Sequence, residues 1–459
     1  MLRQSALNIS INTENKEVPL YLQVSNKVKE MIRTGILKPG EALPGSRELA
    51  VSLNVSRKTT LRAMEILVAE GWLEMKDRVG VFVSNAKGSS DEEKTIETSM
   101  SSLVVDDGSP DTKLLPYLEY SRFYRQALIR AAKWRQMGIC SPKGNENLRN
   151  ILSASMCHER GVNINNEEIL ITQGSQMALY LISQVLLKKG DTVVMENPCN
   201  KNAYDVFVAS GMNVVQIEVD DEGISIDRLR PILEVVPVKA IYLTPRFQYP
   251  TNVTLSITRR HRLAEMIKKY NLLLIEDDFG CMFKYRGSHL LPLSHYLNKE
   301  NFVYVGTFSK IFDSYIRIGY VAASEKAINK MADYRRLIDL QGDKITERTL
   351  FELIDSGVLR RHVRSAGKIY GERLNKISSL INENLAGKVI YKKPSGGLSI
   401  WIQIIKRITR DQLEEILNSR GIQMPLFELT NGKVGIRIGF ATLSDNDMIF
   451  LVNVLKSIL

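Results

Sequence analysis

The sequence predicts an α/β protein in which a small winged helix-turn-helix unit precedes a larger unit built on a mostly parallel sheet. Three observations support this prediction. Three short helical patterns and two strand-like segments fill residues 1–85, and a polar, acidic stretch follows over residues 86–113. Beyond residue 114, apolar runs such as EILIT, TVVME, KAIYL and FVYVG alternate with helical stretches. That alternation is typical of parallel strands covered by helices.

Composition narrows the class of protein further. The 459 residues are 44% apolar and 25% charged, which excludes a collagen-like or fully disordered chain. No apolar run approaches the roughly 18 residues of a membrane span, and the first residues lack a signal-peptide pattern. We therefore expect a cytoplasmic protein without a membrane partner. The net charge of +11 permits an acidic partner such as nucleic acid, but a surface adapted for solubility has the same charge.

The first unit, residues 1–85, is expected to contain three helices and a β-ribbon. Apolar residues at helical spacing predict a helix over residues 20–34, and a second helix is expected over residues 46–53. Ser56 is a suitable N-cap for a third helix that runs to Glu70. The segments WLEMK and GVFVS then flank a turn and predict a two-stranded wing.

A winged helix-turn-helix places its third helix in the major groove of DNA. Basic and hydroxyl side chains gather at the start of that helix, and such groups pair with base edges and phosphates. The alternative is a charge cluster that is merely solvated. The candidate DNA-binding residues are Arg47, Ser56, Arg57, Lys58, Thr59, Arg62, Lys76 and Arg78.

The rest of the chain divides into a linker and the larger unit. Residues 86–113 are rich in serine and acidic residues without sustained periodicity, which predicts a flexible linker. Residues 114–459 form the larger unit. Its last part, from about residue 326, is expected to be a smaller α+β subdomain with strands near residues 398–404 and 434–439.

Several features of the larger unit match what pyridoxal phosphate (PLP) requires. Lys310 follows an apolar strand, where its amine could form a Schiff base. Asp277 ends another apolar run and could pair with the ring nitrogen, although spacing does not distinguish it from Asp278. Gly174, Ser175 and Gln176 begin a helix, where phosphate binds well. Each feature alone is also explained by a structural role without PLP: a surface lysine, a carboxylate in a turn or an ordinary strand-to-helix turn.

The amino-acid sequences of both units resemble those of a known family. PLYLQV, GILKPGEALPGSRELA, VSRKTTLRAMEILVAEGWLE and GVFV resemble the GntR family of bacterial regulators. EEILITQGSQMALYL, GDTVVMENP, IEDDFGCMFKY, GTFSK and VGIRIGFATLS resemble fold-type I PLP-dependent aminotransferases. Together and in this order, the two units resemble the MocR subgroup of GntR regulators.

The resemblance implies roles for individual residues. Lys310 would form the Schiff base with PLP and Asp277 would bind the pyridine nitrogen, while Arg437 would bind the carboxylate of an effector. Phe279 and Asn200 depart from the family, which usually has a tyrosine at both positions, so efficient transamination is less expected. The residues expected around the phosphate are Gly174, Ser175, Gln176, Ser309 and Arg317.

The resemblance therefore implies a homodimeric transcription regulator that binds operator DNA. Its larger unit would bind PLP and sense PLP itself or an amino compound, without a metal ion. Two alternatives stay open. The protein could be a working PLP-dependent aminotransferase, or a regulator whose larger unit has lost PLP.

Overall fold

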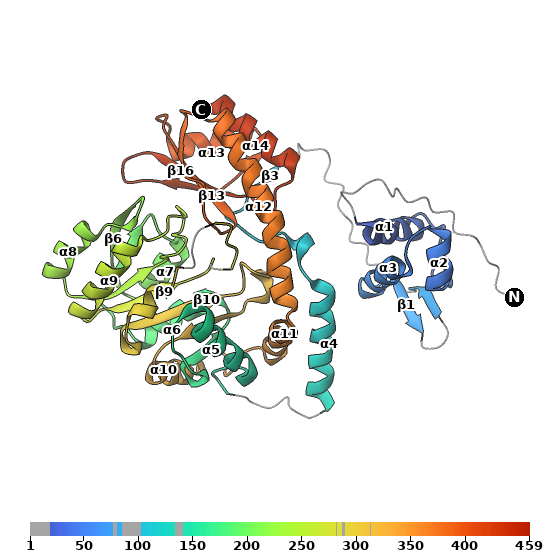
Figure 1. Ribbon diagram of the computed structural model, residues 1–459, viewed down its shortest axis with the longest axis horizontal. Helices are drawn as coiled ribbons and strands as arrows, with labels where there is room; N and C mark the ends of the chain where they lie inside the picture. Colours follow the sequence, from blue (N-terminus) through green and yellow to red (C-terminus); the bar gives the residue numbers. More distant parts are fainter. Residues whose placement is uncertain are drawn as a thin grey trace. The chain divides into compact units, whose positions relative to one another are not determined.

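A computed structural model describes residues 19–76, 80–84, 102–133, 141–280, 282–286, 290–312 and 314–459 of the chain. The chain divides into two compact units, residues 1–99 and residues 100–459 (Figure 1). Each unit has its own hydrophobic core. The two units are therefore described separately.

The small unit contains the three helices and the wing that the sequence predicts. The helices are α1 (Leu20–Arg33), α2 (Ser46–Ser52) and α3 (Arg57–Ala69), and the wing pairs β1 (Leu73–Lys76) with β2 (Gly80–Val83). Val28, Leu49 and Leu67, one from each helix, are almost completely buried in a common core. The core therefore fixes α2 and α3 against α1, as in a helix-turn-helix.

The large unit is built on one eight-stranded sheet. The strand order is β4-β11-β10-β9-β8-β5-β6-β7, and all neighbours from β10 to β6 are parallel. The strands are β4 (Ile169–Thr172), β5 (Thr192–Asn197), β6 (Asn213–Asp220), β7 (Gly223–Ile224), β8 (Val238–Leu243), β9 (Leu273–Asp277), β10 (Phe302–Thr307) and β11 (Gly319–Ala322). The predicted mostly parallel sheet is confirmed.

Helices cover both faces of this sheet, because alternate residues of the strands are apolar on each face. Leu170 and Ile275 pack on one side with α6 (Gly174–Val185), α7 (Lys201–Ala209) and α10 (Glu325–Arg335). Ile169 and Leu274 pack on the other with helices that include α5 (Glu146–Arg160), α8 (Ile226–Val235), α9 (Ile257–Lys269) and α11 (Lys344–Asp355). Residues of the same strand therefore belong to two different cores.

A smaller α+β subdomain follows. It starts after Asp355 rather than near residue 326, because α10 and α11 pack against the large sheet. Its sheet has the order β12-β13-β16-β15 and packs with α12 (Val358–Asn384), α13 (Arg410–Ser419) and α14 (Asp445–Ile458). The strands are β12 (Val389–Tyr391), β13 (Ser399–Ile404), β15 (Leu426–Glu428) and β16 (Val434–Gly439).

The predicted linker differs from the structure at its C-terminal end. β3 (Leu103–Val104) pairs in parallel with β14 (Ile422–Gln423), and Val105 is buried in the core of the subdomain. A short 3-10 helix, Thr112–Leu114, follows before α4 (Tyr117–Lys133). Residues 102–113, which the sequence assigns to the linker, therefore form part of the large unit. The polar composition of this segment hides the two apolar residues, Leu103 and Val105, whose side chains pack on the core of the subdomain.

Candidate functional site

The start of α3 presents the predicted DNA-binding side chains to solvent. Arg57 and Lys58 occupy the first turn of the helix and are exposed, and Arg47 is exposed at the start of α2. Within the described residues, no carboxylate forms a salt bridge with any of these three side chains. These three cations, without a salt-bridge partner in the described part of the chain, are therefore available to phosphates or base edges.

Other candidates have structural contacts as well. Ser56 caps α3, since its hydroxyl accepts a hydrogen bond from the Thr59 amide at 3.1 Å. The Arg62 guanidinium lies 4.4 Å from the centre of the Tyr21 ring, which fixes α3 against α1. Lys76 ends β1, and Arg78 lies outside the described residues. The structure thus brings the candidates on α2 and α3 together, and it does not describe the tip of the wing.

The large unit gathers its candidates at one edge of the sheet. β4 and β10 are both antiparallel to β11, so β4 runs in the same direction as β8, β9 and β10. Gly174, Asp277 and Lys310 come at or just after the ends of β4, β9 and β10. In parallel sheets the carboxyl ends of the strands are where ligands bind.

The start of α6 forms a cradle at this edge. Gly174 has a φ of +78°, and a Cβ atom there would lie 3.0 Å from Arg317 Nη2. A Cβ atom on Gly319 would lie 2.9 Å from the Gly174 carbonyl carbon, so the two backbones touch. The amides of Ser175 and Gln176 belong to the first turn of the helix and have no partner within it. Backbone N–H groups next to an arginine form an anion site.

Asp277 lies in the floor of the site. Its carboxyl group is buried, and Oδ2 accepts a hydrogen bond from the Tyr242 hydroxyl at 2.9 Å. Among the described residues, its Oδ1 is buried without a hydrogen-bond partner. Burial raises the pKa of Asp277 to about 7, and the neighbouring Asp278 adds to this effect. A buried carboxyl oxygen without a partner fits a protonated ring nitrogen, which would supply the missing donor.

Asp278 Oδ1 is also buried without a hydrogen-bond partner among the described residues, but its other oxygen has a different environment, which separates the two carboxylates that the sequence leaves open. Asp278 Oδ2 accepts a hydrogen bond from Tyr304 at 2.5 Å and lies 3.6 Å from Arg160 Nη1 and 3.5 Å from Arg246 Nε. This is a buried ion cluster. Asp277 points the other way, because successive strand residues face opposite sides. It shares its face with Tyr242, and Tyr242 packs in the core that includes α6.

Lys310 forms an ion pair that the sequence analysis missed. Its Nζ donates to Asp107 Oδ1 at 3.0 Å, and the Tyr249 hydroxyl donates to Asp107 Oδ2 at 3.3 Å. Because Asp107 lies in the segment that the sequence predicts to be a linker, no functional role is predicted for it. The apolar triplet Leu103, Val104 and Val105, just upstream, is the signal that could have placed this segment in the fold.

Arg437, predicted to bind an effector carboxylate, is 3% exposed and contacts the chain itself. Its Nε donates to the Asp107 carbonyl oxygen at 2.8 Å, and Nη1 donates to the Pro250 carbonyl and to Asn252 Oδ1 at 2.5 and 2.8 Å. Its guanidinium also lies 4.6 Å from the centre of the Tyr249 ring.

The remaining residues fall around these groups. Ser309 Oγ accepts a hydrogen bond from the Thr307 hydroxyl at 3.2 Å, immediately before Lys310. Asn200 caps α7 through the Asn202 amide at 3.0 Å. The Phe279 ring packs edge-on against Tyr249 at 6.2 Å. Among the described residues, no helix has the length and apolar character needed to cross a membrane.

Comparisons with known proteins agree with this geometry. Residues 20–83 match "Bacterial regulatory proteins, gntR family", and residues 121–455 match "Aminotransferase class I and II". The chain is 29% identical to aromatic-amino-acid aminotransferase 1 of Thermococcus litoralis, over 72% of this chain and 80% of that protein. It is 24% identical to the probable rhizopine catabolism regulatory protein MocR of Rhizobium meliloti, over 87% of this chain and 84% of the relative. Kynurenine aminotransferase of Pyrococcus horikoshii superposes with a TM-score of 0.71 at 27% identity, covering 80% and 93% of the two chains.

Fold and site together define a DNA-binding unit fused to an aminotransferase-like unit, with PLP as the cofactor that the fold and the site indicate. The chain belongs to the class I and II aminotransferase family. With its gntR-family domain, it belongs to the MocR subfamily of GntR regulators, as the sequence predicts.

Proposed function

We propose that this protein is a cytoplasmic transcription regulator that binds operator DNA through α3 and binds PLP at Lys310 to sense the cofactor or an amino compound. The observation that carries the proposal is the pairing of two sites in one chain. One is a helix start with exposed cations, and the other is a floor with an unpartnered buried carboxyl oxygen. A ligand regulates such a protein only if it binds one conformation more tightly than the other.

The cofactor would be held by groups from separate elements. The amides of Ser175 and Gln176, together with Ser309 and Arg317, would bind the phosphate. Asp277 would pair with the ring nitrogen through its free Oδ1. The bound cofactor supplies an aldehyde that forms a covalent link with a lysine amine. Lys310 has to leave the ion pair with Asp107 and lose its proton before its amine can act as a nucleophile.

The covalent link provides the test of this proposal. Wild-type protein mixed with PLP, treated with borohydride and digested should carry the label on Lys310. Lys310→Ala should lose both the label and the absorption band while remaining folded. Lys330→Ala removes an exposed lysine of α10 and serves as the matched control. A label spread over surface lysines, or a band unchanged in Lys310→Ala, contradicts the proposal.

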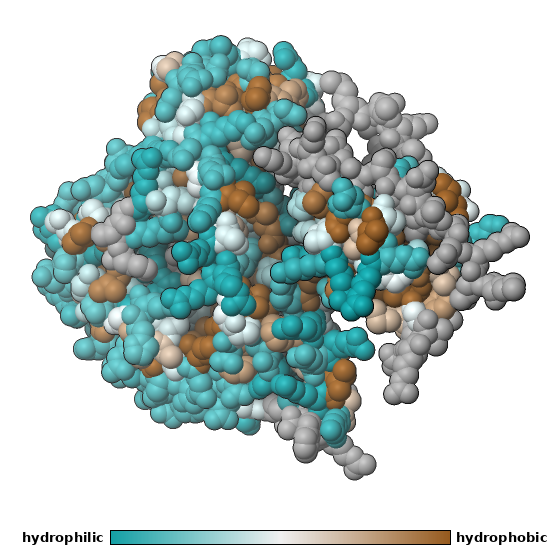
Figure 2. Space-filling model, turned by 45° about the vertical axis from the view of Figure 1, so that its right-hand side comes forward, coloured by the Kyte–Doolittle hydropathy of each residue, from teal (hydrophilic) through white to brown (hydrophobic). Residues whose placement is uncertain are grey.

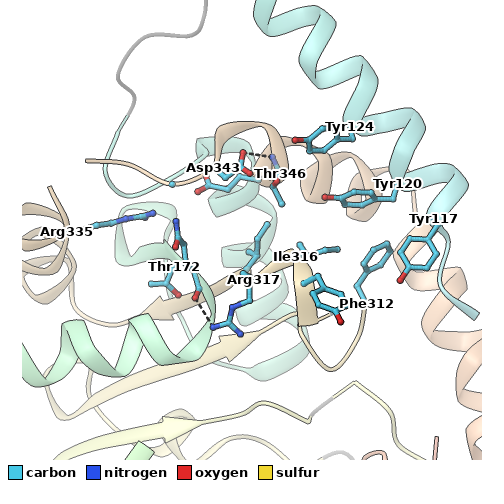
Figure 3. A pocket seen from close by; sticks show the side chains of 15 residues that line it. Tyr117, Tyr120, Tyr124, Thr172, Phe312, Ile316, Arg317, Arg335, Asp343 and Thr346 are labelled. Atoms are coloured by element: carbon cyan, nitrogen blue, oxygen red, sulfur yellow. Dashed lines mark hydrogen bonds between the residues drawn. The ribbon is translucent and has the colours of Figure 1, made fainter. Parts of the chain in front are cut away.

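We also propose a homodimer, supported by the surface around a pocket of about 680 Å³. Tyr117, Tyr120 and Tyr124 of α4 line it together with Phe312 (Figure 3). The segment after α10 borders this pocket, and its Leu337 is 81% exposed. Brown apolar side chains also interrupt the hydrophilic surface of the large unit in Figure 2. Exposed apolar patches of this kind commonly bind another protein surface, and we assign this one to a second copy of the chain.

Sedimentation equilibrium tests the dimer. Wild-type protein should show twice the chain mass of 52.0 kDa. Leu337→Glu should weaken association, because it places a charge where we expect apolar contact. Val235→Glu is the matched control, since Val235 is 83% exposed at the end of α8, away from this pocket. A monomeric wild type, or equal effects of both variants, would refute the assignment.

A further inference from the structure

The segment that carries Asp107 is fixed firmly to the subdomain. The Leu103 amide donates to Gly421 O at 2.7 Å and the Val105 amide donates to Gln423 O at 2.8 Å. The Gly439 amide donates to Asp106 O at 2.8 Å, and a Cβ atom on Gly439 would lie 2.1 Å from Asp106 Oδ1. Only glycine permits this close approach, so the segment is built against the end of β16.

Asp106 strengthens the turn without entering the site. Its Oδ1 accepts from the Gly108 and Ser109 amides at 2.6 and 2.8 Å, and its Oδ2 accepts from the Thr442 hydroxyl at 2.8 Å. The side chain of Asp107 is then directed at Lys310 and Tyr249. Two neighbouring carboxylates therefore have separate tasks, one in the turn and one in the site.

Arg437 is paired inside the protein, in part by the backbone of Asp107. Its guanidinium donates to the Asp107 carbonyl and to two further internal oxygens, and the Asp107 carboxylate acts on it through its charge. Burial opposes ionisation of Asp107, but the charges of Lys310 and Arg437 and hydrogen bonds from Lys310 and Tyr249 hold its pKa below the usual value. The site therefore already contains a carboxylate beside its arginine.

The space beside this pair is small. The cavity lined by Gly108, Asn252, Lys310 and Arg437 has a volume of about 10 Å³. That volume holds about one water molecule. A second carboxylate, brought by an α-amino acid, would meet both a filled space and the negative charge of Asp107.

We propose that Asp107 is an internal substitute for the carboxylate of an amino-acid ligand, so that the site accepts an amine without an α-carboxylate. The evidence is the firm anchoring of Asp107 between Lys310 and Arg437. When Lys310 is engaged elsewhere, Asp107 Oδ1 becomes an acceptor for the ammonium group of such a ligand. The inference rests on the proposed function, because it names the ligand class of the same site.

Calorimetry with a matched pair of ligands tests this selectivity. The full-length protein is loaded with PLP, freed of excess cofactor, and titrated with propylamine and with 2-aminobutyrate, which differ by one carboxylate. We expect propylamine to bind the wild type about tenfold or more tightly than 2-aminobutyrate, because the added carboxylate meets the like charge of Asp107 in a confined space. Asp107→Asn should reduce this preference to less than about threefold, because the neutral side chain no longer repels the carboxylate of 2-aminobutyrate.

Asp106→Asn is the control, because the asparagine oxygen still accepts from the Gly108 and Ser109 amides, its NH2 group can donate to the Thr442 hydroxyl, and the variant should keep the wild-type preference. Tighter binding of 2-aminobutyrate to the wild type, equal affinities, absence of propylamine binding, or an unchanged preference in Asp107→Asn would each overturn the inference. The comparison of propylamine with 2-aminobutyrate on the wild type tests the inference even if a variant fails to fold. Failure to label Lys310 overturns the proposed function instead, whereas labelling of Lys310 together with a lost preference overturns only this inference.

Discussion

At the scale of single residues, Asp277 shows how burial prepares a group for a charged partner. The fold places its carboxyl group in the floor of the site with one oxygen unpaired and raises its pKa to about 7. Without the cofactor, the folded protein holds a proton there that the unfolded chain releases near pH 4. The contribution of Asp277 to stability is therefore fully present below pH 4 and is lost as the pH rises towards 7.

This linkage predicts a pH-dependent difference between the wild type and Asp277→Asn, both without cofactor. Asparagine keeps the hydrogen bond from Tyr242 and cannot ionise. Between pH 5 and pH 7 the wild type should lose about 2–3 kcal/mol of stability relative to the variant. Glu196 and Glu347, whose pKa values burial also raises to about 7, are common to both proteins and cancel in the difference. Parallel pH profiles of thermal unfolding would contradict the assignment.

The residues of the site differ in whether their roles can be predicted from the sequence. Lys310 and Asp277 could be proposed because each directly follows a recognisable apolar strand. Asp107 could not be proposed, because its partner Lys310 lies 203 positions away in the chain. No sequence pattern near Asp107 indicates that contact. Arg437 could be proposed from the family resemblance, but its internal partners lie 330, 187 and 185 positions away in the chain.

At the scale of elements, α3 is the part of the small unit on which DNA binding should depend. Arg57→Ala should weaken binding by about 1–3 kcal/mol if the side chain contacts a base. The DNA can be selected by the wild type from a random-sequence pool and the affinity measured by fluorescence anisotropy at several salt concentrations. Lys27→Ala, on α1 and paired with Glu30, is the control. Equal losses in the two variants would remove Arg57 from the interface.

The contact between the start of α6 and β11 predicts a second effect. Gly319→Ala should destabilise the large unit and abolish PLP binding, because its Cβ would lie 2.9 Å from both the Gly174 carbonyl carbon and Gly306 O. Gly367→Ala, inside α12, should instead stabilise the protein by about 0.5–1 kcal/mol. There the nearest atom, on Phe283, is 3.8 Å away. Normal cofactor binding by Gly319→Ala would show that the cradle is not needed.

Elements with strong periodicity were predicted well, and short ones were not. The helices and wing of the small unit agree with the sequence because caps, glycines and apolar spacing all indicate the same boundaries. β3 has only two residues and exists because β14 pairs with it, so no local pattern can predict it. The boundary of the linker therefore depended on a tertiary contact.

At the scale of the whole molecule, the two compact units predict two unfolding transitions on heating. Calorimetry of the full-length protein should show two transitions, since the small and large units have separate cores. PLP at about 100 times its Kd should stabilise only the large unit, by about 2.7 kcal/mol. Selected DNA should stabilise the other transition. A single transition shifted by both ligands would show instead that the two units unfold together.

Asp277, in the floor of the site, is supported by one core, and Asp107 and Arg437, which form the wall of the site, are supported by another. This separation has an evolutionary consequence. Leu170, Tyr242 and Ile275 support the floor from the sheet of the large unit, whereas Val105 and Ile436 hold Asp107 and Arg437 from the subdomain. Mutations in the wall can therefore accumulate without disturbing the packing beneath Asp277. A lineage of such regulators can acquire a new signal through drift in the subdomain alone and inherit its cofactor chemistry unchanged.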